Sequence, residues 1–280
     1  MGYFKAKRKY QELSLFQKTF IRNGTLEGLR RPAIWTRSLY DLIEYERMRG
    51  QAIRQLEMGA LVAALMVLVI LMIGMVFGML WAVPVMSLFV FGIYFILRER
   101  STLKRQRISQ RIQKIVFPLV RSLTPYVDEE EAIFLHINLN ERFDPANPHR
   151  IDVGHKWLKL NSTLSKGIRF HLHISPVAMK KVGEFHDGKI SVPPHRASIR
   201  MCFPSDLYHP IQKANLRKRL RPCDLGYEFQ ANAKLSSLRN KDEAQFSKRA
   251  VGLIEQGLGC FQYLKEDNPD NSQNRESHAG

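Results

Sequence analysis

Residues 58–97 read MGALVAALMVLVILMIGMVFGMLWAVPVMSLFVFGIYFIL, forty consecutive positions without a charged side chain. This segment decides the fold of the 280-residue chain, because so long an apolar stretch is typical neither of a soluble domain nor of a disordered one. A straight helix of this length would measure about 60 Å, twice the roughly 30 Å of a bilayer's hydrocarbon core. The segment therefore predicts a membrane α-helical hairpin with two spans, near Met58–Leu80 and Val83–Leu97.

The predicted turn between the spans contains Trp81 and Pro84. Tryptophan prefers the membrane–water interface, and proline is tolerated in the first turn of a helix because its missing N–H would be unpaired there anyway. The second span is short, so we expect snorkelling side chains from Arg98 onward to extend it. The alternative is a buried helical hairpin of a soluble protein, which would need a large apolar shell that the rest of this chain does not supply.

Positive charge flanks the apolar segment on both sides. Residues 1–57 hold twelve Lys and Arg against six Asp and Glu, and residues 98–121 hold eight against Glu99 alone. Because positive charge resists translocation, both termini are predicted to be cytoplasmic, with the Trp81–Pro84 turn on the other side. The simplest host is a bacterial inner membrane. The whole chain has a formal net charge of +17.

Apolar spacing changes along the chain and divides it into segments. Helical spacing from Trp35 to Leu56 and from Ile108 to Leu119 predicts helices that continue the spans as a cytoplasmic stalk, with a bend at Gly50. Two amphipathic helices on the membrane surface are the alternative. The predicted organisation is a basic N-terminal tail and amphipathic helix over 1–57, the hairpin over 58–97, a basic helical extension over 98–122, a cytoplasmic α+β domain over 123–264 and a disordered tail over 265–280.

The α+β domain is predicted from alternating apolar and polar residues after Pro125. The expected strands are Ala132–Leu139, Ile168–Ile174 and Ser198–Phe203, and Leu158–Leu164 is expected to add a further strand or a turn. Asp187-Gly188 is typical of a hairpin turn. Helices are expected over Pro210–Leu220 and Ala244–Leu264.

A candidate anion-binding site follows from this alternation, which puts basic side chains on the polar face of the sheet. If the strands are neighbours, Arg169, His171, His173 and Arg200 gather there, and a basic run adds Arg217, Lys218, Arg219 and Arg221. Such a field favours phosphates in a lipid, a nucleotide or a nucleic acid, although positive-inside bias and solubility explain the same charges. Nucleic acid is the least expected of these ligands, because aromatic side chains at stacking intervals are absent from the sequence.

Two further groups of residues suggest contacts. Basic and aromatic residues alternate near the N-terminus, which suits an anionic lipid leaflet, an acidic protein groove or a solvated helix face; the candidate membrane-surface residues are Lys5, Lys7, Arg8 and Lys9. Gly74 and Gly78 form a G-x-x-x-G pattern that lets two helices approach within the hairpin or between copies, so an oligomer is compatible with the sequence. Glycine is also common in membrane helices.

Motifs of catalysis are not found in the sequence. His171 and His173, with His186 and His195, lack the neighbouring carboxylate or thiolate that completes a tetrahedral metal site. Cys202, Cys223 and Cys260 are interpreted as buried or inert thiols. We therefore expect no catalytic residue, no metal and no cofactor, and an enzymatic role as a membrane-bound hydrolase remains the third alternative.

One short segment, Thr163–Phe170, is similar to the D-x-S-x-x-G segment and following strand of PilZ domains, which bind cyclic di-GMP. It departs from that pattern because the aspartate is missing and one residue fewer separates Ser165 from Gly167. The resemblance implies a nucleotide as a ligand to test.

The expected function is a non-enzymatic, membrane-anchored scaffold or assembly component of a larger membrane protein complex. Its basic cytoplasmic surfaces would contact acidic partner proteins or lipid head groups. The alternative is a membrane-bound regulator whose basic sheet face binds a phosphate-bearing ligand such as a nucleotide.

Overall fold

The computed structural model describes residues 2–77, 82–140, 143–144, 147–151, 156–176, 195–211, 220–235 and 242–263. The chain divides into two compact units. The helical unit comprises Met1–Gly24 and Arg37–Ile112, and the sheet unit comprises Thr25–Thr36 and Gln113–Gly280. The sheet unit is thus assembled from two pieces of chain that flank the apolar segment.

The helical unit is formed by α1 (Gly2–Glu12), α2 (Leu15–Asn23), most of α3 (Pro32–Phe77) and α4 (Ala82–Arg105). Ser14 caps α2, and its side chain and that of Gln17 form a reciprocal capping box. Gly24 ends α2 at a φ of 71°, a left-handed conformation that glycine adopts without strain. This cap turns the chain from the helix into the first strand.

Helix α3 is a single helix of 46 residues, about 69 Å long. It continues through Gly50, so this residue does not interrupt the helix. A glycine inside a helix costs only about 1 kcal/mol, and α3 is buried on both sides of it, at Tyr45, Arg49 and Ala52. This packing outweighs the local preference of glycine.

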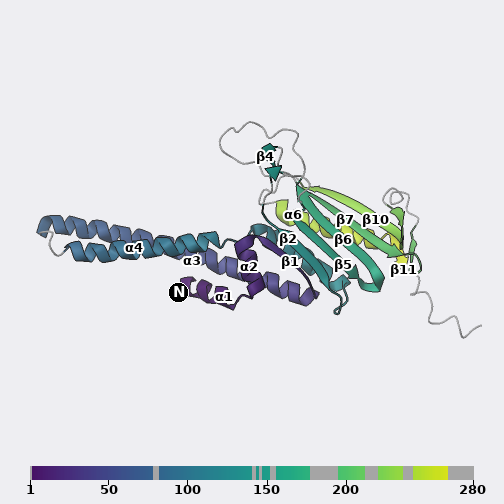
Figure 1. Cartoon of the computed structure of the whole chain (residues 1–280), viewed down its shortest axis with the longest axis horizontal. Helices are drawn as coiled ribbons and strands as arrows, with labels where there is room; N and C mark the ends of the chain where they lie inside the picture. Colours follow the sequence, from purple (N-terminus) through teal and green to yellow (C-terminus); the bar gives the residue numbers. More distant parts are fainter. Residues whose placement is uncertain are drawn as a thin grey trace, which may run out of the picture. The chain divides into compact units, whose positions relative to one another are not determined.

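Helix α4 lies beside α3 and runs antiparallel to it (Figure 1). The Arg49 guanidinium donates to the Leu103 carbonyl at 3.0 Å, and the Tyr45 hydroxyl donates to Gln106 Oε1 at 2.7 Å. Closer to the apolar segment, Arg100 Nε donates to Glu57 Oε1 at 2.8 Å. Hydrogen bonds made by polar side chains therefore join the two segments on one side of the apolar segment.

The basic extension predicted over 98–122 is not one continuous helix. Helix α4 ends at Arg105, and a π-helical turn (Ile112–Val116) and α5 (Phe117–Leu123) follow after an irregular stretch. The Glu46 carboxylate accepts a hydrogen bond from the backbone N–H of Ile108 at 3.0 Å, so a side chain of α3 stabilises the interruption.

The apolar part of α3 is exposed along its length. Within the described residues, one helix, Pro32–Gly74, is long and apolar enough to cross a membrane, and only 6% of its most apolar window is buried. The core helix of a soluble domain would be mostly buried, so the soluble-hairpin alternative does not describe this helix. The apolar part of α4 is also exposed, with Leu88 at 72% and Phe91 at 69%.

These findings show one helix of membrane-spanning length and do not show a two-span hairpin. Residues 78–81, which include Trp81 of the predicted turn, lie outside the described residues, and α4 begins at Ala82 with Pro84 in its first turn. The apolar part of α4, residues 82–97, would be about 24 Å long as a helix.

The sheet unit contains a seven-stranded antiparallel sheet with the order β1-β2-β5-β6-β7-β10-β9. Its strands are β1 (Thr25–Arg30), β2 (Ile133–Asn138), β5 (Leu158–Leu164), β6 (Ile168–Pro176), β7 (His195–Pro204), β10 (Gly226–Leu235) and β9 (Leu220–Cys223). Two small antiparallel pairs are β3 (Phe143–Asp144) with β4 (Asn147–Ile151) and β8 (Tyr208–Pro210) with β11 (Phe261–Tyr263).

Strand β1 is the unexpected member of this sheet, because it precedes the apolar segment and the sheet domain was predicted over 123–264 only. It pairs with β2 from Thr25 opposite Asn138 to Arg30 opposite Ile133. The start of α3 secures the pairing: the buried Trp35 indole donates from Nε1 to the Ile133 carbonyl at 2.8 Å. A Cβ at Gly28 would lie 3.6 Å from the indole ring, so the ring lies close to β1.

One face of the sheet forms the core of this unit, and α6 (Asp242–Leu258) covers part of it (Figure 1). Phe170, Phe203 and Phe229 are completely buried there. Gly257 lets the helix approach closely, because a Cβ at this position would lie 2.5 Å from Met201 Sδ. The strands therefore have a buried apolar face and an opposite face of polar side chains.

Most of the expected elements of the domain are present. The predicted strands coincide with β2, β5, β6 and β7, and the predicted helix over Ala244–Leu264 is α6, which stops at Leu258 and is followed by β11. The helix predicted over Pro210–Leu220 is wrong at both ends, because Pro210 ends β8 and Leu220 begins β9. The Asp187-Gly188 turn, residues 212–219 and the tail over 265–280 lie outside the described residues.

The Trp35 contact generates a stability prediction. Trp35→Ala should lower the free energy of unfolding by about 3–5 kcal/mol, because it leaves a cavity and an unpaired Ile133 carbonyl beneath the edge strand. Ile34→Ala is the matched control, since Ile34 is 46% exposed and its truncation should cost far less. Denaturant titration of the purified full chain in detergent measures both values, and equal losses in the two variants would contradict the proposed contact.

Candidate functional site

The polar face of the sheet brings together four of the predicted anion-binding residues. Arg169, His171 and His173 alternate with buried apolar residues along β6. In the pairing of β6 with β7, His171 lies opposite Arg200, and His173 lies opposite Ser198. The sequence hypothesis that these side chains share one face of one sheet is therefore correct in its geometry.

Glu228 of β10 partly neutralises this face. Its carboxylate lies 3.1 Å from Arg200 Nε, and its side chain is only 15% exposed. In the strand register Glu228 lies between Cys202 of β7 and Arg221 of β9, and Cys202 lies opposite Arg169. Glu228 thus pairs with Arg200 and lies opposite Arg221, while Arg169 lies two strands away, so the three arginines on this face outnumber its one carboxylate.

The two histidines on this face are hydrogen-bonding groups rather than charges at neutral pH. Partial burial lowers the pKa of His171, and the nearby Arg200 and Arg169 lower it further. Partial burial also lowers the pKa of His173, with smaller contributions from Lys156, Arg200 and Lys159. Nδ1 of His171 lies 3.1 Å from Asn161 Oδ1, which orients the ring. A phosphate bound here would favour protonation of both rings.

The cysteines show no sign of an activated nucleophile. Burial raises the pKa of Cys202 to about 11, and a hydrogen bond with Cys223 adds to the shift. A thiol with a raised pKa is protonated at neutral pH and reacts slowly. Cys260 is buried in the sheet unit and donates to the Gln256 carbonyl at 2.9 Å.

In the described part of the chain, no group of three or more His, Cys, Asp and Glu side chains could hold a metal ion. His195 is 2% exposed and packs edge-on against Trp157 at a ring distance of 6.0 Å. His186 lies outside the described residues, as do Arg217, Lys218 and Arg219 of the basic run. Arg221 is described and exposed on β9.

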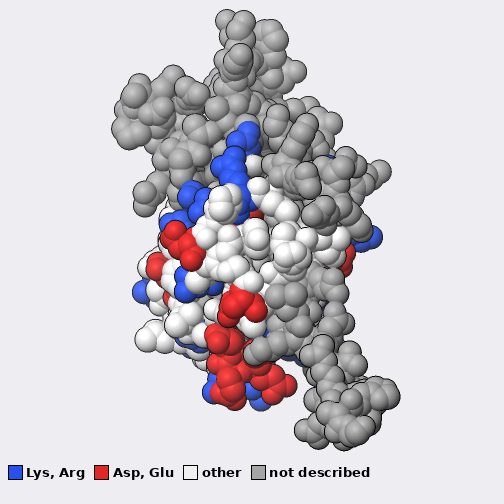
Figure 2. Space-filling model, turned by 90° about the vertical axis from the view of Figure 1, so that its right-hand side faces the viewer, with Lys and Arg blue, Asp and Glu red and all other residues white. Residues whose placement is uncertain are grey.

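The surface of the sheet unit also carries acidic side chains. Asp128 and Glu130 belong to an exposed acidic run before β2, and both have partners: Ser165 Oγ donates to Asp128, and Arg31 forms an ion pair with Glu130. Figure 2 shows Asp and Glu side chains gathered toward the lower end of the face that it presents, with Lys and Arg side chains beside them and above them. The electrostatic field that a charged ligand meets therefore depends on which of these charged groups it approaches, and not only on the net charge of the protein.

The N-terminal basic residues do not have one common role. Lys5, Lys7 and Arg8 are exposed on α1, and Arg8 pairs with Glu12 at 3.1 Å. Lys9 differs, because its ammonium lies 3.0 Å from Asp41 and 2.5 Å from Glu44 and its side chain is 16% exposed.

These bonds raise the pKa of Lys9, chiefly through Glu44, and they attach α1 to α3. Gly74 of the predicted helix-packing pair is buried in α3, and Gly78 lies outside the described residues.

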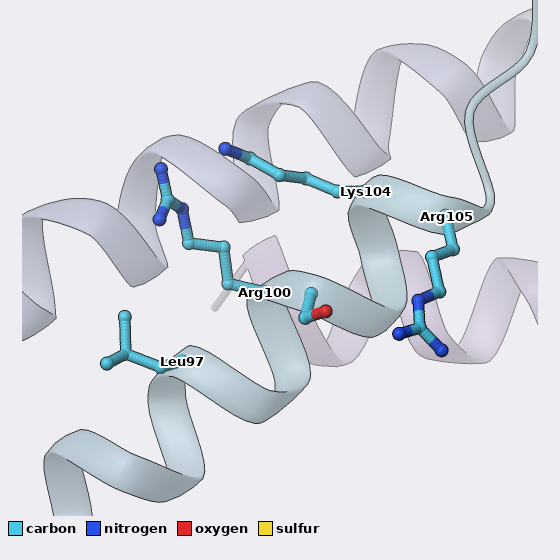
Figure 3. A pocket seen from close by; sticks show the side chains of 5 residues that line it. Leu97, Arg100, Lys104 and Arg105 are labelled. Atoms are coloured by element: carbon cyan, nitrogen blue, oxygen red, sulfur yellow. The ribbon is translucent and has the colours of Figure 1, made fainter.

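Sequence reasoning missed a basic cleft on α4. Its volume is about 400 Å³, and it is lined by Leu97, Arg100, Ser101, Lys104 and Arg105 (Figure 3). The spacing of three, four, seven and eight residues from Leu97 is that of one helix face, and this periodicity is the signal that could have found it. A second cavity, of about 240 Å³, is mostly apolar and includes Tyr126, Lys166 and Phe203 in its lining.

Comparison of the chain with protein-family models, with curated proteins and with solved structures returns no match. The function must therefore be argued from the residues and their geometry.

The histidines of the polar face predict how stability depends on pH. Because their pKa is lowered in the folded protein from a usual value near 6.5, the unfolded chain binds protons more readily, and stability should decrease as the pH falls below that value. His171→Asn with His173→Asn should flatten the dependence of the melting temperature on pH. His209→Asn, at an exposed site on β8, should leave it unchanged. An unaltered pH profile in the double variant would argue against the two rings as its source.

Proposed function

We propose that this protein is a membrane-anchored, non-enzymatic scaffold or assembly component, with a two-span hairpin in the bilayer and the rest of its chain in the cytoplasm. The exposed apolar surface of α3 carries this proposal. Met58, Leu65 and Met72 are each more than half exposed, as lipid-facing side chains would be. In water such a continuous apolar surface would drive aggregation.

The pairing of β1 with β2 supports the two-span topology. Thr25–Arg30 precedes the apolar segment and Ile133–Asn138 follows it, yet the two strands are neighbours in one sheet. A chain that crossed the bilayer once would leave these strands in different compartments. The pairing therefore supports a chain that crosses twice and keeps its two flanks on one side.

The charges at the end of α4 support the short second span. Arg98 and Arg100 follow the apolar part directly, and long basic side chains reach the interface while their stems stay in the lipid. A span about 24 Å long needs such extension or a locally thinner bilayer. The excess of Lys and Arg on both flanks favours the cytoplasm as their compartment.

A scaffold role fits the distribution of polar groups. Lys5, Lys7 and Arg8 offer exposed positive charge on α1, and Arg169, Arg200 and Arg221 do so on the sheet. Acidic proteins or anionic lipids would be the partners of such surfaces. The membrane segment itself lacks ionisable side chains of the kind that transport requires.

Membrane fractionation followed by partner identification tests this proposal. The full chain should stay in the membrane pellet after alkaline carbonate washing and should co-purify in detergent with other proteins at fixed stoichiometry. Lys5→Gln with Lys7→Gln and Arg8→Gln should weaken this association while the chain stays in the pellet. Release by carbonate would reject the membrane anchor, and purification as a solitary monomer would reject the scaffold.

A second candidate function is a regulator that binds a phosphate-bearing ligand on the polar face of the sheet. The observation that favours it is the placement of Arg169 and His171 on β6 beside Arg200 on β7. Because the histidine rings are neutral at pH 7, binding of an anion should take up protons and strengthen as the pH falls.

A nucleotide panel tests this second function. In the full chain, nucleotide should raise the melting temperature, and Arg169→Gln with Arg200→Gln should abolish the increase. Glutamine at position 200 can still donate to Glu228, which limits the structural damage. Arg47→Gln with Arg54→Gln, at two exposed positions of α3, is the control of equal charge. Unchanged melting across the panel would eliminate the regulator.

A further inference from the structure

In the proposed topology, the basic cleft on α4 lies close to the depth of the lipid phosphates. Leu97, the last residue of the apolar segment, forms one end of its lining. Arg100 and Arg105 lie three and eight residues further along the helix, about 4.5 and 12 Å from Leu97 at 1.5 Å per residue. The polar layer of a bilayer leaflet is roughly 5–8 Å thick, so the proposed topology places these side chains at and just beyond the head groups.

The charges of the cleft exceed what Glu57 can neutralise. Arg100 donates to Glu57 Oε1 through both Nε and Nη2, at 2.8 and 2.5 Å. The Lys104 ammonium lies 3.8 Å from the same oxygen, a distance that is too long for a good hydrogen bond. Among the described residues, Arg105 has no carboxylate within ion-pair distance. Arg100 and Lys104 thus share one carboxylate, and Arg105 adds a third positive charge.

The side chains are arranged around an open space rather than in contact with one another. Figure 3 shows Arg100 and Lys104 extending to one side of α4 and Arg105 extending to the other. Lys104 is 53% exposed, and Ser101, which also lines the cleft, is exposed between them and can donate through its hydroxyl. Cationic donors and a hydroxyl around a cavity of about 400 Å³ are suited to a phosphate group.

We propose that this cleft binds the head-group phosphate of an anionic phospholipid, with Lys104, Arg105 and Ser101 as donors and Leu97 beside the acyl chains. The inference rests on the proposed membrane anchoring and adds a specific ligand to it. A lipid is favoured over a soluble phosphate because the lining ends in Leu97, which is 45% exposed at the border of the apolar segment. A soluble anion would make no favourable contact with this apolar end. A phospholipid would contact the cations with its phosphate and Leu97 with its acyl chains.

Native mass spectrometry of the full chain, purified in detergent, tests the lipid site. The probes are phosphatidylglycerol and phosphatidylcholine, added at equal concentrations with and without inorganic phosphate. Phosphatidylglycerol should be retained preferentially, and inorganic phosphate should not displace it. Lys104→Gln with Arg105→Gln should lower this retention at least about tenfold, the effect expected from losing one charge-assisted hydrogen bond.

Two controls separate a site from general attraction between charges. Arg54→Gln with Arg107→Gln removes the same charge from exposed positions outside the cleft and should leave retention nearly unchanged. Lys104→Arg with Arg105→Lys keeps both charges and should preserve retention. Equal losses in both Gln pairs, equal retention of the two lipids or displacement by inorganic phosphate would overturn the lipid site. Release of the unaltered chain from membranes by carbonate would instead reject the anchor on which the site depends.

Discussion

Six residue pairs join β1 to β2, and this short ladder constrains the rest of the molecule. Thr25–Arg30 lies before the apolar segment and Ile133–Asn138 lies after it, so whatever path the chain takes between them, it must return to its starting place. A backbone ladder of this kind tolerates little slippage, because a shift by one residue would move Ile133, Leu135 and Ile137 out of the core. The buried Trp35 indole, bonded to the Ile133 carbonyl, fixes the point at which the chain leaves the sheet for α3.

The membrane segment and the polar surfaces acquire their roles from this constraint. If α3 enters a bilayer, α4 must bring the chain back, and the bonds from Tyr45, Arg49 and Glu57 to α4 hold the two helices together before they reach the lipid. In the proposed topology, the same return brings the basic cleft of α4 back to the membrane surface from which α3 started. The proposed anchor and the proposed lipid contact both follow from this one topology, and neither requires an active site.

Sequence patterns predicted those parts of the fold that depend on local periodicity. Alternation located β2, β5, β6 and β7, and it placed Arg169, His171 and Arg200 on one face because residues two apart in a strand share a face. Non-local features were not predictable in this way. Thr25–Arg30 has no alternation that marks it as a sheet edge, and its partner strand begins more than a hundred residues later. Tertiary packing overrode the local preference of Gly50, and the role of Lys9 depends on Asp41 and Glu44, which only the packing of α1 on α3 brings near. The cleft of α4 was missed because its residues were counted as flanking charge rather than as a helix face.

Cross-linking of the two flanks in sealed membrane vesicles tests the central claim most directly. In a chain without its native cysteines, Glu27→Cys and His136→Cys place two thiols at directly opposed positions of β1 and β2. The account predicts that this pair forms a disulfide under mild oxidation, that Glu27→Cys with Leu135→Cys does not, and that both single variants react with an impermeant thiol reagent from the same side of the membrane. Labelling of positions 27 and 136 from opposite sides would contradict it.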